Sequence, residues 1–344
     1  MALAAVAMLA GVAGGLGRLG LPLPPLVVGT VAWHGPLLAS VFFGTVIALE
    51  RAVAYKARWA YVAPLLAALA GPLLVHGFVM PAAWCLVVAS ALLTAVSALV
   101  ARQHPAAFTA VFLLGAFSWL AGSLAWVVTG TVAASVPLWM NFLVLTIAGE
   151  RLELSRLRPP TRWGVWVFAS IIVAAMLGAA VDTRLLGAAY VALTAWLLRF
   201  DIARFTIRMP GLPRYIASCL LPGFAWLAVG GVLLAGGPLL PGSPPYDAAL
   251  HAVLVGFVLS MVFGHAPIIL PAVTGWAVPF SPALYAPLVV LHASVVLRVL
   301  GDLGGNASLR VAGSAGHALA LVCFAGVLVA AKASGARSPR PAAG

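Results

Sequence analysis

The sequence is poor in charge: charged residues make up 8% of its 344 residues, and only seven residues are acidic. Hydrophobic residues make up 64% of the chain, and its mean hydropathy is +1.13. A soluble domain has no use for so much apolar surface, whereas successive segments here reach the ~20 residues that span a hydrocarbon core. The composition therefore predicts an all-α polytopic membrane protein and excludes a soluble domain.

Long polar stretches are also missing before the C-terminal end. We expect one transmembrane domain over residues 1–331 and a short polar cytoplasmic tail over residues 332–344. The N-terminus, MALAAVAMLAGVAGGL, has neither the basic flank nor the cleavage site of a secretory signal, so we expect it to form the first span. Cysteine is scarce too. Cys85, Cys219 and Cys323 fall in three different expected spans, which excludes a disulfide framework and a cysteine zinc site.

The basic residues that are present indicate a topology. Twelve spans fit the pattern: residues 2–17, 34–51, 59–79, 82–100, 106–130, 133–154, 163–181, 184–203, 215–236, 246–270, 282–301 and 308–331. With the N-terminus in the cytoplasm, 15 of the 19 Lys and Arg lie on the inner side and four lie outside. We therefore predict a multi-pass protein of a bacterial cytoplasmic membrane with both termini inside. The net charge of +12 then reflects topology and contact with lipid, and no nucleic-acid partner is needed.

Similar motifs end the second and sixth spans. TVIALERAV contains Glu50-Arg51, LTIAGERLEL contains Glu150-Arg151, and the tenth span carries His265 near the same depth. A true repeat would indicate three four-helix arcs around a pseudo-threefold axis, and chance similarity between apolar helices is the alternative. Because carboxylates in a membrane are costly, Glu50 and Glu150 are candidates for a proton relay or gate. They are otherwise partners in interfacial ion pairs.

Histidines lie inside several expected spans. His251 and His265 are 14 residues apart in YDAALHAVLVGFVLSMVFGHAPIILPAV, which places them on one helix face roughly 21 Å apart. His34 begins the second span at the depth of His251, so the two imidazoles are predicted to hold a b-type haem between them. His265, His292 and His317 are candidates for a second site that holds another haem or copper. For each histidine, a hydrogen-bonded packing role is the alternative.

Two arginines near the expected outer surface are candidates for binding haem propionates. Arg298 and Arg310 flank the connection between the eleventh and twelfth spans, and a guanidinium pairs well with a carboxylate. Ordinary interfacial arginines are the alternative. Asp247 precedes His251 by one helical turn, so it either accepts the imidazole N–H or caps the helix.

Two stretches resemble a known family. WHGPLLASVFFGTVIALERAVA and LHAVLVGFVLSMVFGHAPIILPAV look like the paired signatures of NnrS-like membrane proteins, and FLVLTIAGERLELSRL is a further marker of this branch. The resemblance implies about twelve spans, haem and copper, and a link to nitric oxide and denitrification. It supports His34, His251 and His265 as metal-site positions. The chain departs from better-known members after Gly264-His265, where Ala-Pro follows instead of Thr-Gly-Arg.

The predicted architecture also resembles the catalytic subunit of haem-copper oxidases. Those subunits have twelve spans in three four-helix arcs, with low-spin haem ligands on the second and tenth helices, where His34 and His251 lie. The sixth and seventh spans here contain no histidine, so the copper ligands and cross-linked tyrosine of an oxygen-reducing centre are missing. The resemblance implies a haem-binding relative and not a terminal oxidase.

Three functional hypotheses follow. The first is a membrane haem protein, with one or two haem b groups and copper as a further metal, that transfers electrons or handles nitric oxide or another small gas with a redox partner. The second is a cofactor-free secondary transporter with a His/Glu proton relay, in which GHAPIILPAVTG forms a broken helix. The third is a structural subunit of a respiratory complex.

Overall fold

The computed structural model describes residues 2–237, 240–276 and 278–335, and the described residues contain helices and connecting turns without any strand. Ten of the described helices are long and apolar enough to cross a membrane: Val27–Tyr55, Arg58–Val75, Val79–Gln103, Ala107–Thr129, Val132–Leu157, Arg162–Val181, Leu212–Ala235, Pro244–Thr274, Pro282–Leu303 and Ala307–Lys332. The all-helical prediction is therefore confirmed for the described residues, and the long apolar helices fit a polytopic membrane protein.

The number of predicted spans differs from this count by two. The other two predicted spans correspond to α1 (Ala2–Gly17) and α9 (Thr183–Phe200). α1 is a shorter apolar helix, and α9 carries Arg184 and Arg199 near its two ends, which lowers its mean hydropathy. At the other end of the chain, α15 (Ala307–Gly335) continues past residue 331 into the predicted tail, while residues 336–344 lie outside the described residues.

Local chemistry explains several helix boundaries. α8 (Arg162–Val181) begins after Thr161, whose hydroxyl accepts the Gly164 N–H at 3.1 Å. α9 begins after Asp182, whose carboxylate accepts the Arg184 N–H at 2.9 Å. α6 (Ala107–Thr129) ends at Gly130, which adopts the left-handed conformation that glycine favours at this position.

The second and tenth predicted spans are composite helices of the same kind. The second runs from η1 (Pro25–Trp33) through α2 (His34–Pro36) and the π-helical segment η2 (Leu37–Phe42) to α3 (Phe43–Tyr55). The tenth joins α12 (Pro244–His251), the π-helical segment η6 (Ala252–Leu259) and α13 (Ser260–Thr274). In both, the π-helical turns follow a histidine within three residues. Such turns are rare and occur often at functional sites.

α13 runs without a break through two internal prolines, Pro267 and Pro271. A proline at position 267 has no N–H to donate to the carbonyl of Phe263. The hydroxyl of Tyr215, from α11 (Leu212–Ala235), donates to this carbonyl at 3.2 Å and so replaces the missing bond. The broken helix expected under the transporter hypothesis is therefore not observed at this segment.

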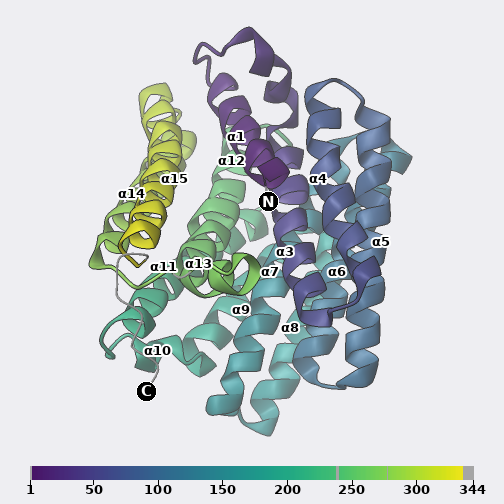
Figure 1. Ribbon diagram of the computed structural model, residues 1–344, viewed down its shortest axis with the longest axis vertical. Coiled ribbons are helices and arrows are strands. Elements are labelled where there is room, and N and C mark those ends of the chain that lie inside the picture. The colour runs from purple at the N-terminus through teal and green to yellow at the C-terminus, as the bar shows by residue number, and fades with distance from the viewer. Residues whose placement is uncertain (1, 238–239, 277, 336–344) are drawn as a thin grey trace, which may run out of the picture.

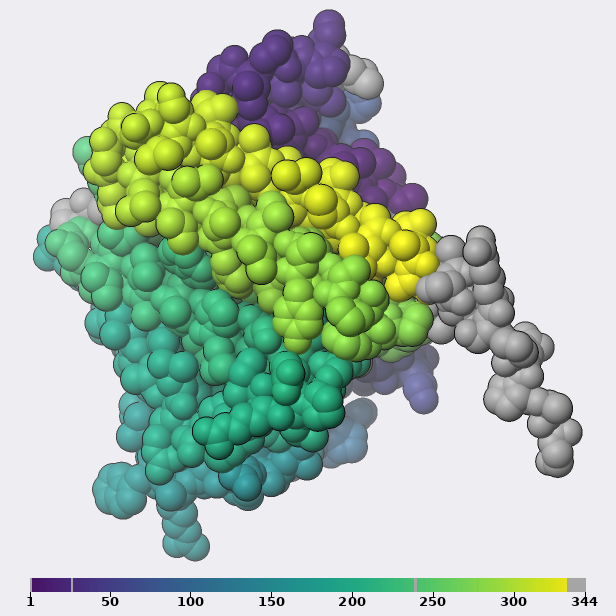
Figure 2. All heavy atoms as spheres, turned by 90° about the vertical axis from the view of Figure 1, so that its left-hand side faces the viewer, coloured from purple at the N-terminus to yellow at the C-terminus, as the bar shows by residue number. Residues whose placement is uncertain are grey.

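The helices that correspond to the second, sixth and tenth predicted spans contact one another at the centre of the molecule (Figure 1). α7 (Val136–Leu154) packs against η2 and η6, and α3 packs against α13. α4 (Val62–Val75) and α5 (Val79–Gln103) lie on one flank, while α14 (Tyr285–Leu303) and α15 lie on the other. Figure 2 shows α14 and α15 side by side across that face, with α1 beside α15. We call the two ends of the central helices the His34 end, which contains His34 and His251, and the Glu50 end, which contains Glu50 and His265.

Candidate functional site

Three histidines share a hydrogen-bonding pattern at the His34 end. The Nδ1 atom of His34 lies 2.7 Å from the carbonyl oxygen of Gly11, and that of His251 lies 2.7 Å from the carbonyl oxygen of Asp247. A carbonyl oxygen only accepts, so both Nδ1 atoms carry the proton. Each Nε2 atom therefore keeps its lone pair.

His317 has the same tautomer for a related reason. Its Nδ1 atom lies 2.7 Å from the hydroxyl oxygen of Ser294. That hydroxyl donates its own proton to the carbonyl of Leu291 at 2.7 Å, so it accepts from the imidazole. The Nε2 atom of His317 is buried and has no hydrogen-bond partner. Metal-binding histidines show this pattern, in which an oxygen acceptor fixes the ring and leaves the other nitrogen free.

The three rings come from different parts of the chain. The rings of His251 and His317 are 5.8 Å apart between centroids, with planes inclined by 23°. His34 lies within electrostatic range of both. Among the described residues, no group of three or more His, Cys, Asp or Glu side chains is arranged to hold a metal ion. The arrangement therefore provides a close pair with a third imidazole nearby.

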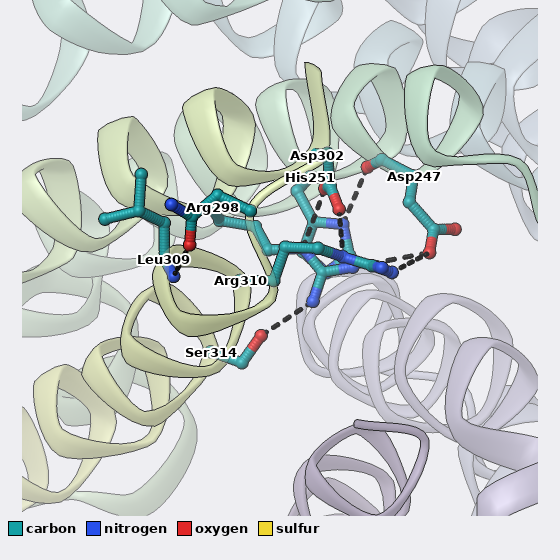
Figure 3. Close-up of polar contacts among 8 residues, drawn as sticks. Asp247, His251, Arg298, Asp302, Leu309, Arg310 and Ser314 are labelled. Atoms are coloured by element: carbon teal, nitrogen blue, oxygen red, sulfur yellow. Dashed lines mark hydrogen bonds and ion pairs between the residues drawn. The ribbon is translucent and has the colours of Figure 1, made fainter. Parts of the chain in front are cut away.

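An ion-pair network ties together the helices that carry this pair (Figure 3). The buried guanidinium of Arg298 donates to Asp302 at 2.8 Å, to Ser314 at 2.8 Å and to Asp247 at 3.3 Å. Arg310 lies 2.7 Å from Asp302 and 4.0 Å from Asp247. Asp247 is on α12, Arg298 and Asp302 are on α14, and Ser314 and Arg310 are on α15. The network therefore fixes α12 and α15, and with them His251 and His317.

These contacts define what Arg298, Arg310 and Asp247 do. Every nitrogen of the Arg298 guanidinium already has a protein partner, so we do not assign this residue to a propionate. Arg310 is the more accessible of the two arginines, with 29% of its side chain exposed. Asp247 orients His251 through its main-chain carbonyl, while its carboxylate pairs with Arg298.

Glycines allow the backbones to approach at this end. A Cβ atom on Gly313 would lie 2.6 Å from the main-chain nitrogen of Arg298, and one on Gly316 would lie 2.6 Å from Ser294 Cβ. Small residues at such positions let membrane helices pack closely. On α1, a Cβ atom on Gly15 would lie 2.6 Å from the His34 ring. Gly15 therefore leaves the space that this imidazole occupies.

His292 differs from the three histidines because both of its nitrogens are used. The indole N–H of Trp226 donates to Nδ1 at 3.1 Å, so Nε2 carries the proton and faces Ser260 Oγ at 3.3 Å. Ser260 in turn donates to the carbonyl of Cys219 at 2.8 Å. With no free lone pair, His292 is a packing residue in a closed polar chain.

His265 belongs to a charged cluster at the Glu50 end. Its Nδ1 atom donates to the Met261 carbonyl at 2.7 Å, so Nε2 accepts from Arg151 at 3.4 Å. Arg151 also forms two hydrogen bonds with Asp201, at 2.7 and 3.2 Å, and both side chains are nearly inaccessible. A guanidinium directed at Nε2 opposes a metal cation there. This geometry suits a hydrogen-bonding role for His265.

The two Glu-Arg motifs meet at the same end. Arg51 pairs with Glu150 at 3.3 Å, and both side chains are about one-fifth exposed. The Arg51 guanidinium also lies 3.8 Å from the centroid of the Phe112 ring. Glu50 lies within electrostatic range of Glu150, Arg51 and His265. Two carboxylates therefore lie close to an imidazole and an arginine, which are the components of a proton relay.

Most of the site residues predicted from the sequence thus form two groups at opposite ends of the central helices. His34, His251, Arg298 and Arg310 gather at the His34 end, and Glu50, Glu150 and His265 gather at the Glu50 end. No contact joins His265, His292 and His317 into one site among the described residues, since each bonds to different partners. Sequence reasoning missed Asp302 and Asp201. The Arg298–Asp302 spacing of one helical turn was the available signal for Asp302.

One comparison with known proteins gives a match. A family model described as a domain of unknown function (DUF8744) matches residues 1–333. No curated protein and no solved structure matches the chain. Because the family model covers nearly the whole chain, the protein belongs to the DUF8744 family.

Proposed function

We propose that this protein is a membrane haem protein in which His34 and His251 would hold a b-type haem. The observation that carries the proposal is the tautomer of these two histidines. Both have Nδ1 fixed by a carbonyl oxygen at 2.7 Å and Nε2 free to bind iron. Two such nitrogens would bind the iron of a haem.

Other features of the same end fit such a group. The Nε2 atom of His317 is buried without a partner, which is a costly state for a polar atom in a membrane protein. Gly15 leaves room for the His34 ring, and Arg310 has an exposed edge that suits a carboxylate. A haem with two histidine ligands supplies electron transfer, and one with an open position binds small gases such as nitric oxide. These features support a haem at this end.

Copper is the second candidate for the same histidines. His251 and His317 are in ring contact, and their tautomers make both rings nitrogen donors. Imidazole nitrogen suits copper as well as haem iron. In this form of the proposal His251 and His317 would hold the copper, and His34 is a third imidazole nearby.

We further propose twelve spans in three four-helix arcs, with α1 and α9 crossing the membrane as well. Contacts of α7 with η2 and η6, and of α3 with α13, support a central position for the second, sixth and tenth spans. The matching histidine and π-helical segment in the second and tenth spans support their equivalence. The distribution of Lys and Arg supports a bacterial cytoplasmic membrane with both termini inside.

The resemblance to NnrS-like proteins supports nitric oxide chemistry or electron transfer in denitrification, with a redox protein or respiratory subunits as partners. A transporter remains the rival function. The proximity of His265 to the Glu50 carboxylate favours a proton role at the Glu50 end. Such a role is compatible with a haem at the opposite end.

A reduced-minus-oxidised visible spectrum and metal analysis of the purified protein test the proposal. We expect b-type haem absorption that is lost in both His34→Ala and His251→Ala and retained in His292→Ala. If metal analysis finds copper without haem, the copper form of the proposal replaces the haem form. A wild-type protein that was produced with haem and copper supplied and contains neither would overturn both.

A further inference from the structure

A cavity of about 690 Å³ lies between four helix ends at the Glu50 end. Residues of α3, α5, α6 and α7 line it, at the level where these helices begin or end. We therefore expect the cavity to lie near a membrane surface, at the opposite end of the central helices from His34 and His251.

The lining carries an excess of positive charge. Arg51, Lys56 and Arg156 face one acidic residue, Glu153. Lys56 and Arg156 are exposed, and within the described part of the chain neither forms an ion pair. Two cations are thus available to an anionic ligand.

Aromatic rings pack against the guanidinium groups of Arg51 and Arg156. The guanidinium of Arg156 lies 4.1 Å from the Phe108 ring centroid, and that of Arg51 lies 3.8 Å from the Phe112 centroid. A guanidinium that lies on a ring keeps the N–H groups at its edge free to donate to oxygen. This arrangement suits an oxyanion such as phosphate.

Lys56 occupies an unusual backbone conformation. Its φ is +62°, and it is the only residue other than glycine with a positive φ in the described part of the chain. It ends α3, a position where glycine is the usual residue. A strained conformation that persists at such a place motivates a functional explanation.

The rest of the lining is partly apolar. Ala54, Val96 and Val100 contribute to this part, together with the two phenylalanine rings. The uncharged polar side chains of the lining include Ser97, Gln103, His104 and Thr109. We propose that the cavity binds an anionic phospholipid, with its phosphate between Lys56 and Arg156 and part of an acyl chain against Val96 and Val100. Basic pockets between membrane helices bind such headgroups, and the apolar wall distinguishes a lipid from free phosphate.

Native mass spectrometry of the full chain in detergent tests this site. The protein is titrated separately with phosphatidylglycerol, phosphatidylcholine and inorganic phosphate. We expect a one-to-one adduct with phosphatidylglycerol at a concentration at least about 10-fold lower than with either alternative, since two cations contribute to its binding.

Variants then locate the site. Lys56→Gly and Arg156→Gln should each weaken the phosphatidylglycerol adduct roughly 5-fold, and the double variant about 30-fold. Glycine suits the conformation at position 56, so melting temperatures should show that Lys56→Gly remains folded. Arg162→Gln, at an exposed arginine of the same end outside the cavity, is the matched control and should bind as the wild type does.

Four results would overturn the proposal. Equal binding of phosphatidylcholine would remove the role of charge, and phosphate that binds as tightly as the lipid would assign the cavity to a free anion. Unchanged binding in the double variant would place the lipid elsewhere. An equal loss in Arg162→Gln would indicate general attraction to a basic surface.

Discussion

The two ends of the central helices use histidine in different ways. His251 and His265 are on the same composite helix, and each donates from Nδ1 to the carbonyl four residues earlier at 2.7 Å. At the His34 end, the ring of His251 lies beside His317, whose Nε2 has no hydrogen-bond partner. At the Glu50 end, Nε2 of His265 faces the guanidinium of Arg151. The partner of the second nitrogen therefore distinguishes the proposed metal ligand His251 from His265, which is a hydrogen-bonding residue.

Charge differs between the ends as well. At the His34 end, Arg298 and Arg310 are balanced by Asp247 and Asp302, so the network is neutral overall and fixes helix positions. At the Glu50 end, the buried Arg151–Asp201 pair is next to a second, more exposed pair, Arg51–Glu150. We expect the first end to respond to variants mainly in metal content and the second mainly in stability.

The largest expected effect is at the buried pair of the Glu50 end. Asp201→Asn would leave the Arg151 charge without its partner, at a cost of about 3–5 kcal/mol in unfolding free energy. Chemical unfolding in mixed micelles measures this loss. Asp182→Asn is the control, because Asn caps a helix as well as Asp, and it should leave stability unchanged. A wild-type unfolding curve for Asp201→Asn would contradict the inferred role of this pair.

The next effect concerns the group that orients His317. In the copper form of the proposal, Ser294→Ala removes the acceptor of the Nδ1 proton and should weaken copper binding about 10–100-fold. Ser260→Ala, next to His292, serves as the control, since we assign no metal to that chain of hydrogen bonds. Metal content at limiting supply measures both variants. Equal losses in the two would remove the distinction between His317 and His292.

A smaller effect is expected where His34 packs on α1. Gly15→Ala would place a methyl group 2.6 Å from the His34 ring and displace the imidazole. We expect roughly 10-fold weaker cofactor binding, at the lower end of the range for a ligand that loses its support. Gly326→Ala adds the same methyl group with no atom within 4 Å and should have no effect. Full cofactor content in Gly15→Ala, titrated at limiting haem, would argue against His34 as a ligand.

The smallest effect is expected at the exposed pair of the Glu50 end. Glu150→Gln removes the partner of Arg51, yet both side chains are about one-fifth exposed and Arg51 keeps its contact with Phe112. The loss of unfolding free energy should not exceed about 1 kcal/mol. A loss as large as that of Asp201→Asn would show that the two pairs act as one network.

Much of the fold could be predicted from hydrophobic length, since span boundaries depend on composition over about 20 residues. That His34 and His251 lie at the same end of the bundle could also be predicted, because each is within a few residues of the start of its span. His317 was grouped with the wrong neighbours because sequence gives depth only approximately and does not give the rotation of a helix. The rings of His317 and His251 lie side by side in the fold, with centroids 5.8 Å apart.

The role of each Nε2 atom could not be predicted in the same way. It depends on helix packing, which places Arg151 against His265 and Trp226 against His292. The π-helical segments η2 and η6 also change which side chains face the bundle centre, and no sequence pattern identified them. Local spacing therefore predicted candidates, and tertiary contacts distinguished them.

Electron paramagnetic resonance of the oxidised protein, produced with haem and copper supplied, tests the central claim most directly. For the wild type we expect a low-spin ferric signal from two nitrogen ligands, or in the second form of the proposal a cupric signal with coupling to imidazole nitrogen. His251→Ala should lose this signal and His265→Ala should keep it. A signal that survives in His251→Ala and disappears in His265→Ala would contradict the account.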